Sequence, residues 1–336
     1  MKINRETGSL SRRFCIAPMM DCTDRHFRFF ARLMTQHALL YTEMVTAEAI
    51  IHGDRDYLLG CDAFEQPVAL QLGGSNPHAL AESAKIGEQY GYQEINLNVG
   101  CPSDRVQAGR FGACLMKEPQ LVAECVMAMQ RAVCIPVTLK TRLGVDAHDS
   151  DELLHDFVRL VFAAGCTTFI VHARKAWLQG LSPRENRHIP PLQYERVYHL
   201  KKAFPQLEII INGGITEYED VALHLNHVDG VMLGREVYAN PYFLAGVDQR
   251  FFDAAPTITD ELTVIARYQE YVNQQLALGV PSRVLIRYLV GLFKGQPGAR
   301  QWRRYVSEHS NRDALASNLW NAAHQFLGLQ KRDEWK

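Results

Sequence analysis

Long apolar runs are missing from this sequence, and their absence excludes one class of protein. No stretch approaches the roughly 18 consecutive apolar residues that a membrane-spanning helix needs. Basic side chains stand near the start of the chain, but no apolar segment follows them as it would in a signal peptide. We therefore expect a protein that has no membrane span and works in the cytoplasm.

Cysteine pairs with metal-binding spacing are missing as well. The eight cysteines all lie in the first half of the chain, and none of them forms a CxxC pair. No Cys/His spacing resembles a zinc or iron–sulfur site, so we expect no metal. Free thiols in a chain of 336 residues without a secretion signal also fit a reducing cytoplasm.

An excess of charge of either sign is also lacking, because the formal net charge is only −1. The molecule as a whole therefore offers no electrostatic attraction for nucleic acid, and any such contact must be local. A GxGxxG motif is absent, so a dinucleotide held as in Rossmann folds is not indicated.

What the sequence does contain is a series of short apolar runs, each followed by a longer amphipathic segment. The runs predict strands at 14–17, 39–41, 68–72, 94–98, 136–140, 168–172, 208–212 and 230–234. Helical patterns lie between them at 78–90, 119–132, 150–164, 194–204 and 217–225. Eight such repeats predict an α/β protein with a (β/α)8 TIM barrel over residues 1–252. A doubly wound open sheet is the alternative on pattern alone.

Helix-start signals support two of these helices. Asn76-Pro77 precedes one of them, and Thr216 with Glu219 three residues later precedes another. Both combinations are typical of a helix N-terminus, where a side-chain oxygen accepts a hydrogen bond from a free backbone N–H.

The pattern changes after residue 252. Residues 254–257 (Ala-Ala-Pro-Thr) predict a linker, and strand-like runs stop. Apolar residues at spacings of three and four predict helices at 259–278, 281–292, 300–307 and 313–327. We expect a small all-helical C-terminal domain over residues 256–336.

Glycine-rich turns follow the seventh and eighth predicted strands. In a TIM barrel the carboxyl ends of the strands converge on the face that holds the active site. Here these two strands end in Asn212-Gly213-Gly214 and Gly234-Arg235. Such turns let backbone N–H groups approach a phosphate, and Arg235 adds positive charge. The alternative for each glycine alone is a simple tight turn.

Three other strand ends carry side chains suited to a flat, ring-shaped ligand. Lys140 ends an otherwise apolar strand, where a lysine is costly unless it meets an anion or lines a cavity. Gln71 offers donors and an acceptor to the edge of a heterocycle, and His172 ends the sixth strand. Singly, Lys140 also fits an edge lysine and His172 a core histidine. Together with the glycine turns they predict a mononucleotide site, for which FMN fits best.

Cys101 lies in the segment 98–103 (Asn-Val-Gly-Cys-Pro-Ser), which follows the fourth predicted strand. Gly100 permits a turn that a Cβ would hinder, and Pro102 restricts the backbone after the thiol. A stiff loop at the catalytic end of a barrel strand thus presents a thiol that can give up its proton. The alternative is a small buried hydrophobe, which is what most free cysteines are.

Taken together, these motifs resemble the tRNA-dihydrouridine synthase family. The resemblance rests on 17–19 (Ala-Pro-Met), 98–103, 140–142 (Lys-Thr-Arg), 212–214 and 234–235. Two stretches, 101–107 (CPSDRVQ) and 297–304 (PGARQWRR), are similar to the A branch of that family. The resemblance runs from about residue 14 to about residue 310, in order and with no motif missing.

The resemblance implies an enzyme that uses FMN and NADPH to reduce the C5=C6 bond of a tRNA D-loop uridine, at positions 20 and 20a. It implies that hydride passes from reduced FMN to C6 and that Cys101 donates the proton to C5. The residues that it places on the flavin are Ala17, Pro18, Met19, Gln71, Lys140, His172, Asn212, Gly213, Gly214, Gly234 and Arg235. Those at positions that contact tRNA in this branch are Asn98, Arg184, Arg187, Arg300 and Arg303.

Positive charge is concentrated in the predicted helical domain. Residues 280–312 hold seven basic side chains against a single acidic one. Arg300 and Arg303 lie at helical spacing, with Trp302 and Tyr305 interleaved. Arginine contacts to phosphate and aromatic stacking on bases are how structured RNA is held, so this pattern favours tRNA as the partner. A solvated helix face is the alternative.

Two other functions stay open from the sequence. A small-molecule FMN barrel of the dihydroorotate dehydrogenase kind would share the phosphate turns, although it needs no arginine-rich appendage. A non-catalytic RNA-binding barrel would not need Cys101, Lys140 and His172 together. The oligomeric state is not encoded in any motif, and we take a monomer as the starting expectation.

Overall fold

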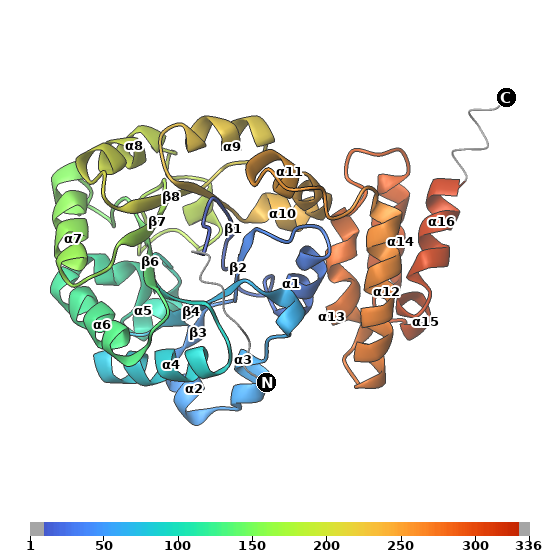
Figure 1. The fold of residues 1–336 in the computed structure, drawn as a ribbon, viewed down its shortest axis with the longest axis horizontal. Helices are drawn as coiled ribbons and strands as arrows, with labels where there is room; N and C mark the ends of the chain where they lie inside the picture. The colour runs from blue at the N-terminus through green and yellow to red at the C-terminus, as the bar shows by residue number, and fades with distance from the viewer. Residues whose placement is uncertain (1–9, 329–336) are drawn as a thin grey trace.

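A closed barrel of parallel strands dominates the computed structural model, which describes residues 10–328 (Figure 1). Its strands are β1 (Phe14–Ile16), β2 (Leu39–Tyr41), β4 (Val68–Gly73), β5 (Glu94–Val99), β6 (Val137–Arg142), β7 (Thr168–His172), β8 (Glu208–Asn212) and β9 (Gly230–Leu233). They pair in the order β2-β1-β9-β8-β7-β6-β5-β4, and a β2–β4 pairing closes the ring. This closure confirms the predicted TIM barrel and excludes the open sheet.

The predicted strands are all present, with ends shifted by no more than two residues. Lys140 was expected at the end of its strand but lies inside β6, which continues to Arg142. The short strand β3 (Val45–Thr46), which pairs with β4, was not predicted. Two residues are too few to show the alternation by which a strand is recognised.

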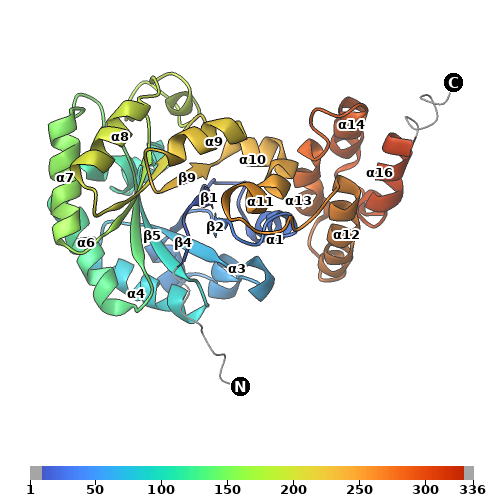
Figure 2. The ribbon, with the colours of Figure 1, turned by 45° about the horizontal axis from the view of Figure 1, so that its top comes forward.

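Helices surround the barrel on its outside, as Figures 1 and 2 show. The α-helices of this region are α1 (Arg25–Arg32), α2 (Ala47–His52), α3 (Arg55–Leu59), α4 (Pro77–Gln89), α5 (Asp104–Ala108), α6 (Pro119–Ala132), α7 (Asp151–Ala163), α8 (Tyr194–Ala203), α9 (Tyr218–Leu225), α10 (Arg235–Ala239) and α11 (Val247–Phe251). Short 3₁₀ helices are η1 (Ala63–Glu65), η2 (Gly112–Lys117), η3 (Glu185–Arg187) and η4 (Pro241–Gly246).

Side-chain caps explain one of the two predicted helix starts. The Asn76 side chain accepts hydrogen bonds from two backbone N–H groups at the start of α4, and Pro77 occupies its first turn, as predicted. The prediction at Thr216 with Glu219 was wrong. Helix α9 has Glu217 at its N-cap position, and no side chain caps it.

The interior of the barrel contains an apolar cluster and a polar one. The apolar cluster consists of Cys15, Ala17, Leu39, Tyr41, Ala69, Ile170, Ile210 and Met232. The polar residues are buried on β4, β5 and β6 and include Gln71, Glu94, Asn96, Asn98 and Thr138. Because buried polar groups must find hydrogen-bond partners, these side chains are expected to bond to one another.

A group of helices follows the barrel in the chain and lies beside α1, α10 and α11 (Figure 2). Its members are α12 (Glu261–Ala277), α13 (Ser282–Ile286), the 3₁₀ helix η5 (Arg287–Gly291), α14 (Ala299–His309), α15 (Asp313–Ala316) and α16 (Leu319–Gly328). The all-helical prediction is confirmed within the described residues. Two of the predictions of a single helix were wrong. The segment 281–292 contains α13 followed by the 3₁₀ helix η5, and the segment 313–327 is divided into α15 and α16.

Ion pairs join these C-terminal helices to the barrel. Arg287 and the Tyr288 hydroxyl both donate to the carboxylate of Asp24, which also caps α1. Lys294 Nζ lies 2.6 Å from Glu236 Oε1 at the start of α10. Two of the basic residues that the sequence pattern assigned to RNA therefore hold the two regions together.

The division into residues 1–252 and 256–336 remains a proposal. The outer ends of these two ranges, 1–9 and 329–336, lie outside the described residues. None of the helices described is long and apolar enough to cross a membrane.

Candidate active site and family

A cavity of about 680 Å³ opens at the carboxyl ends of the barrel strands. This volume lies within the usual range for small-molecule and cofactor sites. Every residue that the sequence analysis assigned to a flavin lines it, as do Cys101, Asn98 and Arg187. Arg184, Arg300 and Arg303 are not part of its lining. The strand ends thus bring together residues that are up to about 220 positions apart in the chain.

The two glycine turns after β8 and β9 form one end of the cavity. Gly213 and Gly214 have φ angles of +121° and +73°, a backbone region that side chains other than glycine rarely adopt. A Cβ at Gly214 would lie 2.5 Å from a Leu192 methyl carbon. These positions therefore require glycine, and they expose backbone to the cavity.

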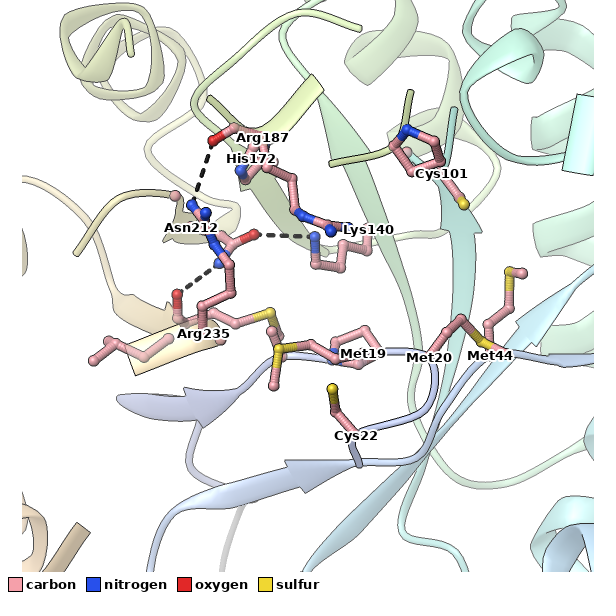
Figure 3. Close-up of a pocket in the computed structure, with 18 of the residues that line it drawn as sticks. Met19, Met20, Cys22, Met44, Cys101, Lys140, His172, Arg187, Asn212 and Arg235 are labelled. Atoms are coloured by element: carbon pink, nitrogen blue, oxygen red, sulfur yellow. Dashed lines mark hydrogen bonds between the residues drawn. The ribbon is translucent and has the colours of Figure 1, made fainter. Parts of the chain in front are cut away.

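Lys140 extends from β6 into the cavity. Its Nζ donates to Asn212 Oδ1 at 3.1 Å, while Asn212 Nδ2 donates to the Met232 carbonyl at 2.7 Å (Figure 3). Removal from water lowers the pKa of Lys140 to about 7, and the neighbouring Arg142 contributes. No carboxylate pairs with Lys140 within residues 10–328. Its amine is therefore placed to gain a negatively charged ligand.

His172 is buried at the end of β7 beside the same cations. Burial lowers its pKa well below the ordinary value, and the charges of Arg142 and Lys140 add to the effect. The ring is therefore neutral at physiological pH. Its Nδ1 is buried without a hydrogen-bond partner in the described part of the chain. An unsatisfied buried polar atom at the wall of a cavity indicates a group that a ligand completes.

The loop that carries Cys101 is held by hydrogen bonds from three directions. Asn98 Oδ1 accepts from the backbone N–H of Gly100 at 3.1 Å and of Cys101 at 3.0 Å. The backbone N–H of Ala113 donates to the Cys101 carbonyl at 2.9 Å. Arg142 Nε donates to the Gly100 carbonyl at 3.0 Å. The thiol is only partly buried and stands on a braced backbone, as the Gly-Cys-Pro sequence predicted.

The opposite wall of the cavity carries four more sulfur-containing side chains, of which the sequence analysis had assigned only Met19. In Figure 3, Cys101 is separated by open space from Met19 and Cys22, and Met44 lies to one side. Met20, next to them, is 53% exposed. No motif marks Met20, Cys22 and Met44, because they lie in the β1–α1 and β2–β3 loops, whose paths are not encoded in periodicity.

Arg142 was also missed as a functional residue, although it stands only two positions after Lys140. Besides its bond to the Cys101 loop, its Nη1 donates to the carbonyls of Lys175 at 3.3 Å and Asn186 at 3.0 Å. It thus connects the thiol loop with the loop after β7. Side chains alternate along β6, so Lys140 and Arg142 lie on the same face of the strand. This spacing of two is the signal that could have identified Arg142 as a residue of the cavity.

More cationic side chains surround the mouth of the cavity. Arg235 Nη1 lies 2.5 Å from His188 Nε2, and its Nη2 donates to the Arg187 carbonyl at 3.3 Å. Arg235 is the largest cause of the lowered pKa of His188. Arg184, just before η3, and Arg187, at its end, flank this site and are exposed. The mouth is therefore positively charged although the formal net charge of the chain is −1.

The C-terminal helix α14 carries the remaining predicted contact residues. Arg300 and Arg303 are exposed there. Trp302, which the sequence pattern placed among RNA-stacking residues, is only 1% exposed, and its Nε1 donates to the Leu289 carbonyl at 2.7 Å. That part of the prediction was wrong, because the Trp302 side chain packs against Phe293 and Phe326 in the core of the C-terminal helices. Tyr305, half-buried against Phe326, is not a free stacking platform either.

Within the described residues, no group of three or more His, Cys, Asp or Glu side chains is placed to hold a metal ion. All eight cysteines are free thiols.

Comparison with known proteins connects this cavity to a family. The family model for dihydrouridine synthase (Dus) matches residues 15–327. This chain belongs to the Dus family. The match includes the barrel, the cavity and the C-terminal helices, so the family is assigned across both regions.

Individual relatives agree with the assignment. The tRNA-dihydrouridine(20/20a) synthase of Shewanella oneidensis is 56% identical over 322 residues, which is 96% of this chain and 96% of that protein. The proteins of the same name from Synechocystis sp. and Escherichia coli K12 are 59% and 57% identical. They cover 92% and 94% of this chain, and the matches span 93% and 92% of their own lengths.

A solved structure shares the fold at much lower similarity. A complex of 2-naphthoyl-CoA reductase with 2-naphthoyl-CoA aligns with a TM-score of 0.54 and 11% identity. The alignment covers 70% of this chain and 50% of that one. Such a likeness shows only that the barrel architecture recurs.

Proposed function

We propose that this Dus family member reduces the C5=C6 bond of uridine to 5,6-dihydrouridine in the D-loop of tRNA, at positions 20 and 20a. The observation that carries the proposal is a single cavity that combines glycine turns, unneutralised cations and a thiol on a braced loop. Relatives matched over nine-tenths of the chain bear this activity in their names. That name specifies tRNA, and not a small free pyrimidine, as the substrate of those relatives.

FMN fits the cavity as the cofactor. The turn at Gly213 and Gly214 offers backbone that no Cβ obstructs, and Arg235 adds positive charge for a phosphate. The unpartnered Nδ1 of His172 and the Nζ of Lys140 are available to a polar ring. We assign to the flavin Ala17, Pro18, Met19, Gln71, Lys140, His172, Asn212, Gly213, Gly214, Gly234 and Arg235.

The chemistry divides between the cofactor and the protein. Bound FMN, reduced by NADPH, supplies the hydride that no side chain can supply. Cys101 holds the proton that C5 of the uridine must receive, because its thiol lines the same cavity and its loop is fixed. Lys140 would stabilise the negative charge that a reduced flavin carries, in a site that excludes most water.

The tRNA must be held while the target base leaves its stack. Extruding a base costs a few kcal/mol, which contacts to the rest of the tRNA must offset. We assign this role to Arg184 and Arg187 at the cavity mouth and to Arg300 and Arg303 on α14, all of which are exposed. Asn98, which lines the cavity, is assigned to the base itself.

The proposal is tested with purified protein, NADPH and a tRNA transcript that carries no modifications. We expect the protein to contain bound FMN and to form dihydrouridine at positions 20 and 20a, as mapped by mass spectrometry of tRNA fragments. Free uridine and dihydroorotate serve as control substrates. A protein without flavin, or one that turns over either control as fast as tRNA, would contradict the proposal.

A further inference from the structure

The polar residues inside the barrel form one continuous chain of hydrogen bonds that starts at the thiol loop. At its upper end, Asn98 Oδ1 accepts from the backbone N–H of Cys101 at 3.0 Å. Asn98 Nδ2 donates in turn to Gln71 Oε1 at 2.8 Å. Both Asn98 and Gln71 line the cavity. The upper end of the chain therefore supports the active site directly.

The lower part of the chain runs sideways across three strands. Gln71 Nε2 donates to Asn96 Oδ1 at 2.7 Å, and Asn96 Nδ2 donates to Thr138 Oγ1 at 2.8 Å. Gln71, Asn96 and Thr138 are register partners on β4, β5 and β6, so their side chains share one layer of the barrel. Thr138 Oγ1 finally donates to Glu94 Oε1 at 2.7 Å. The chain thus ends at a carboxylate below the cavity.

Glu94 is held in place by other buried groups. Arg12 Nε donates to Glu94 Oε2 at 2.6 Å, and the Tyr41 hydroxyl donates to Glu94 Oε1 at 2.7 Å. Arg12 also binds a second carboxylate, Glu208, which accepts from Thr168 Oγ1 at 2.9 Å. Glu94 is completely buried, and none of these five residues lines the cavity. The lower end of the chain is therefore a fixed acceptor.

The two ends decide the direction of every hydrogen bond between them. The Cys101 backbone N–H can only donate, and the Glu94 carboxylate, paired with Arg12, accepts from Thr138. A side-chain amide has one donating and one accepting end, so each amide along the way must face the same direction. One set of amide orientations satisfies all the links, and it points the amide nitrogen of Asn98 at Gln71 and that of Gln71 at Asn96.

We propose that Thr138 is a positioning residue for the reaction, because its hydroxyl transmits the orientation set by Glu94 to Gln71 and Asn98 and thereby to the Cys101 loop. Each amide nitrogen keeps a second N–H beyond its bond in the chain. Donors of this kind suit the carbonyl-rich edge of a flavin or a uracil. The inference rests on the proposed function, and it gives a role to residues that touch neither cofactor nor substrate.

Substitutions at Thr138 separate this role from simple packing. Thr138→Ser keeps the hydroxyl. Thr138→Ala leaves a space in which a water molecule can join Asn96 to Glu94. Thr138→Val fills the space with a methyl group and breaks the link. The chain therefore predicts activity in the order Ser, Ala, Val, whereas packing alone puts Val first, because valine has the shape of threonine.

Thr168→Val is the matched control. Thr168 is also a buried threonine that donates to a carboxylate of the same network, Glu208, but it accepts nothing from the chain that leads to the cavity. Both valine variants therefore remove one hydroxyl bond to a buried carboxylate. Only Thr138→Val interrupts the chain.

The experiment measures kcat and KM for tRNA, the visible absorption bands of the bound flavin, and Tm, for all four variants. We expect Thr138→Val to lower kcat about tenfold, with KM for tRNA changed less than twofold and the flavin bands shifted. Thr168→Val should keep the wild-type bands and kcat. Equal kcat in the two valine variants, or an activity order with Thr138→Val first, would overturn the inference.

A substitution at a second residue of the chain, Asn96, tests the inference independently of Thr138. Asn96→Leu, which preserves the approximate shape, should reproduce the loss in kcat and the band shift, and the double variant with Thr138→Val should lose no more than either alone. Additive losses would contradict a shared chain. A parallel assay of Cys101→Ala keeps the two hypotheses apart, since full activity in that variant would refute the proposed function and not the chain.

Discussion

Cationic side chains in the barrel cavity and on the C-terminal helices are used in different ways. In the cavity, Lys140 and Arg142 have only neutral hydrogen-bond partners, and no carboxylate pairs with them in the described structure. In the C-terminal region, Arg287 and Lys294 pair with carboxylates of the barrel. The sequence alone shows all four as basic residues of similar kind.

The difference shows where each region needs a ligand. Positive charge removed from water without a counter-charge is unfavourable, and the lowered pKa values of Lys140, Arg142 and His172 reflect it. An anion in the cavity would relieve this cost. In the C-terminal region, pairing has already neutralised part of the charge, so that only residues such as Arg300 and Arg303 stay available for an outside partner.

The largest expected effect concerns the thiol of the barrel region. Cys101→Ala should slow tRNA reduction by roughly 10²–10⁴-fold, because a positioned general acid contributes about that much. Flavin content should be unchanged, since the thiol is not a partner of the glycine turns. Rates of tRNA-dependent oxidation of the reduced enzyme, measured in a stopped-flow instrument, check the loss.

The control for this variant is Cys22→Ala on the opposite wall of the cavity. Its rate should stay within a few-fold of wild type if the braced loop of Cys101 is what selects the proton donor. A larger loss from Cys22 than from Cys101 would reverse the assignment.

The next effect concerns stability in the C-terminal region. Trp302→Ala should lower the free energy of unfolding by about 3–5 kcal/mol, because it removes a buried aromatic side chain and its hydrogen bond to Leu289. Trp320→Ala, at a site 38% exposed, should change it by less than about 1 kcal/mol. Urea denaturation of both variants gives the comparison, and similar losses would show that Trp302 is not a core residue.

A smaller effect is expected from the free arginines of α14. Arg300→Ala and Arg303→Ala should each weaken tRNA binding several-fold and reduce the slope of log affinity against log salt by about 1. Arg304→Ala is the control, because Arg304 is already paired with Glu308 at 2.8 Å on the same helix. NADPH oxidation should be intact in all three. Equal losses of tRNA affinity at the three positions would mean that pairing with a carboxylate does not decide which arginine binds tRNA.

The last effect is a pH dependence that arises from Lys140. Its pKa is lowered to about 7 in the folded protein, so between pH 7 and about 10 the unfolded chain binds a proton that the folded one does not. Flavin-free protein should therefore gain stability as pH rises through this range, by about 1 kcal/mol per unit from this residue. Lys140→Met should remove that part of the slope in urea denaturation at pH 7 and pH 9. Identical slopes would show that the lysine is not desolvated.

Much of the barrel site was predictable from the sequence because a closed barrel brings the carboxyl ends of all its strands to one face. Once eight strands are recognised, Gln71, Asn98, Lys140, His172 and Asn212 must meet at one end, whatever their distance along the chain. The glycine turns added a second signal, because a φ angle such as +121° at Gly213 favours glycine, and the sequence shows that glycine directly.

The C-terminal region was less predictable because a helix has several faces. Helical spacing places Trp302 among arginines in sequence, but only tertiary packing decides that it turns inward. The pairing of Arg287 with Asp24 joins residues 263 positions apart, and no local pattern signals it. The hydrogen-bond chain through Thr138 was invisible for the same reason, since it depends on register between neighbouring strands.

The central claim is that one cavity brings a flavin, a uridine and the Cys101 thiol together. The most direct test is the distance between Cys101 Sγ and C5 of the target uracil in a crystal structure of the protein with FMN and tRNA bound. We predict about 3–4 Å, within reach for proton transfer. A uracil bound outside the cavity, or a sulfur that faces away from C5 with no water between them, would contradict the account.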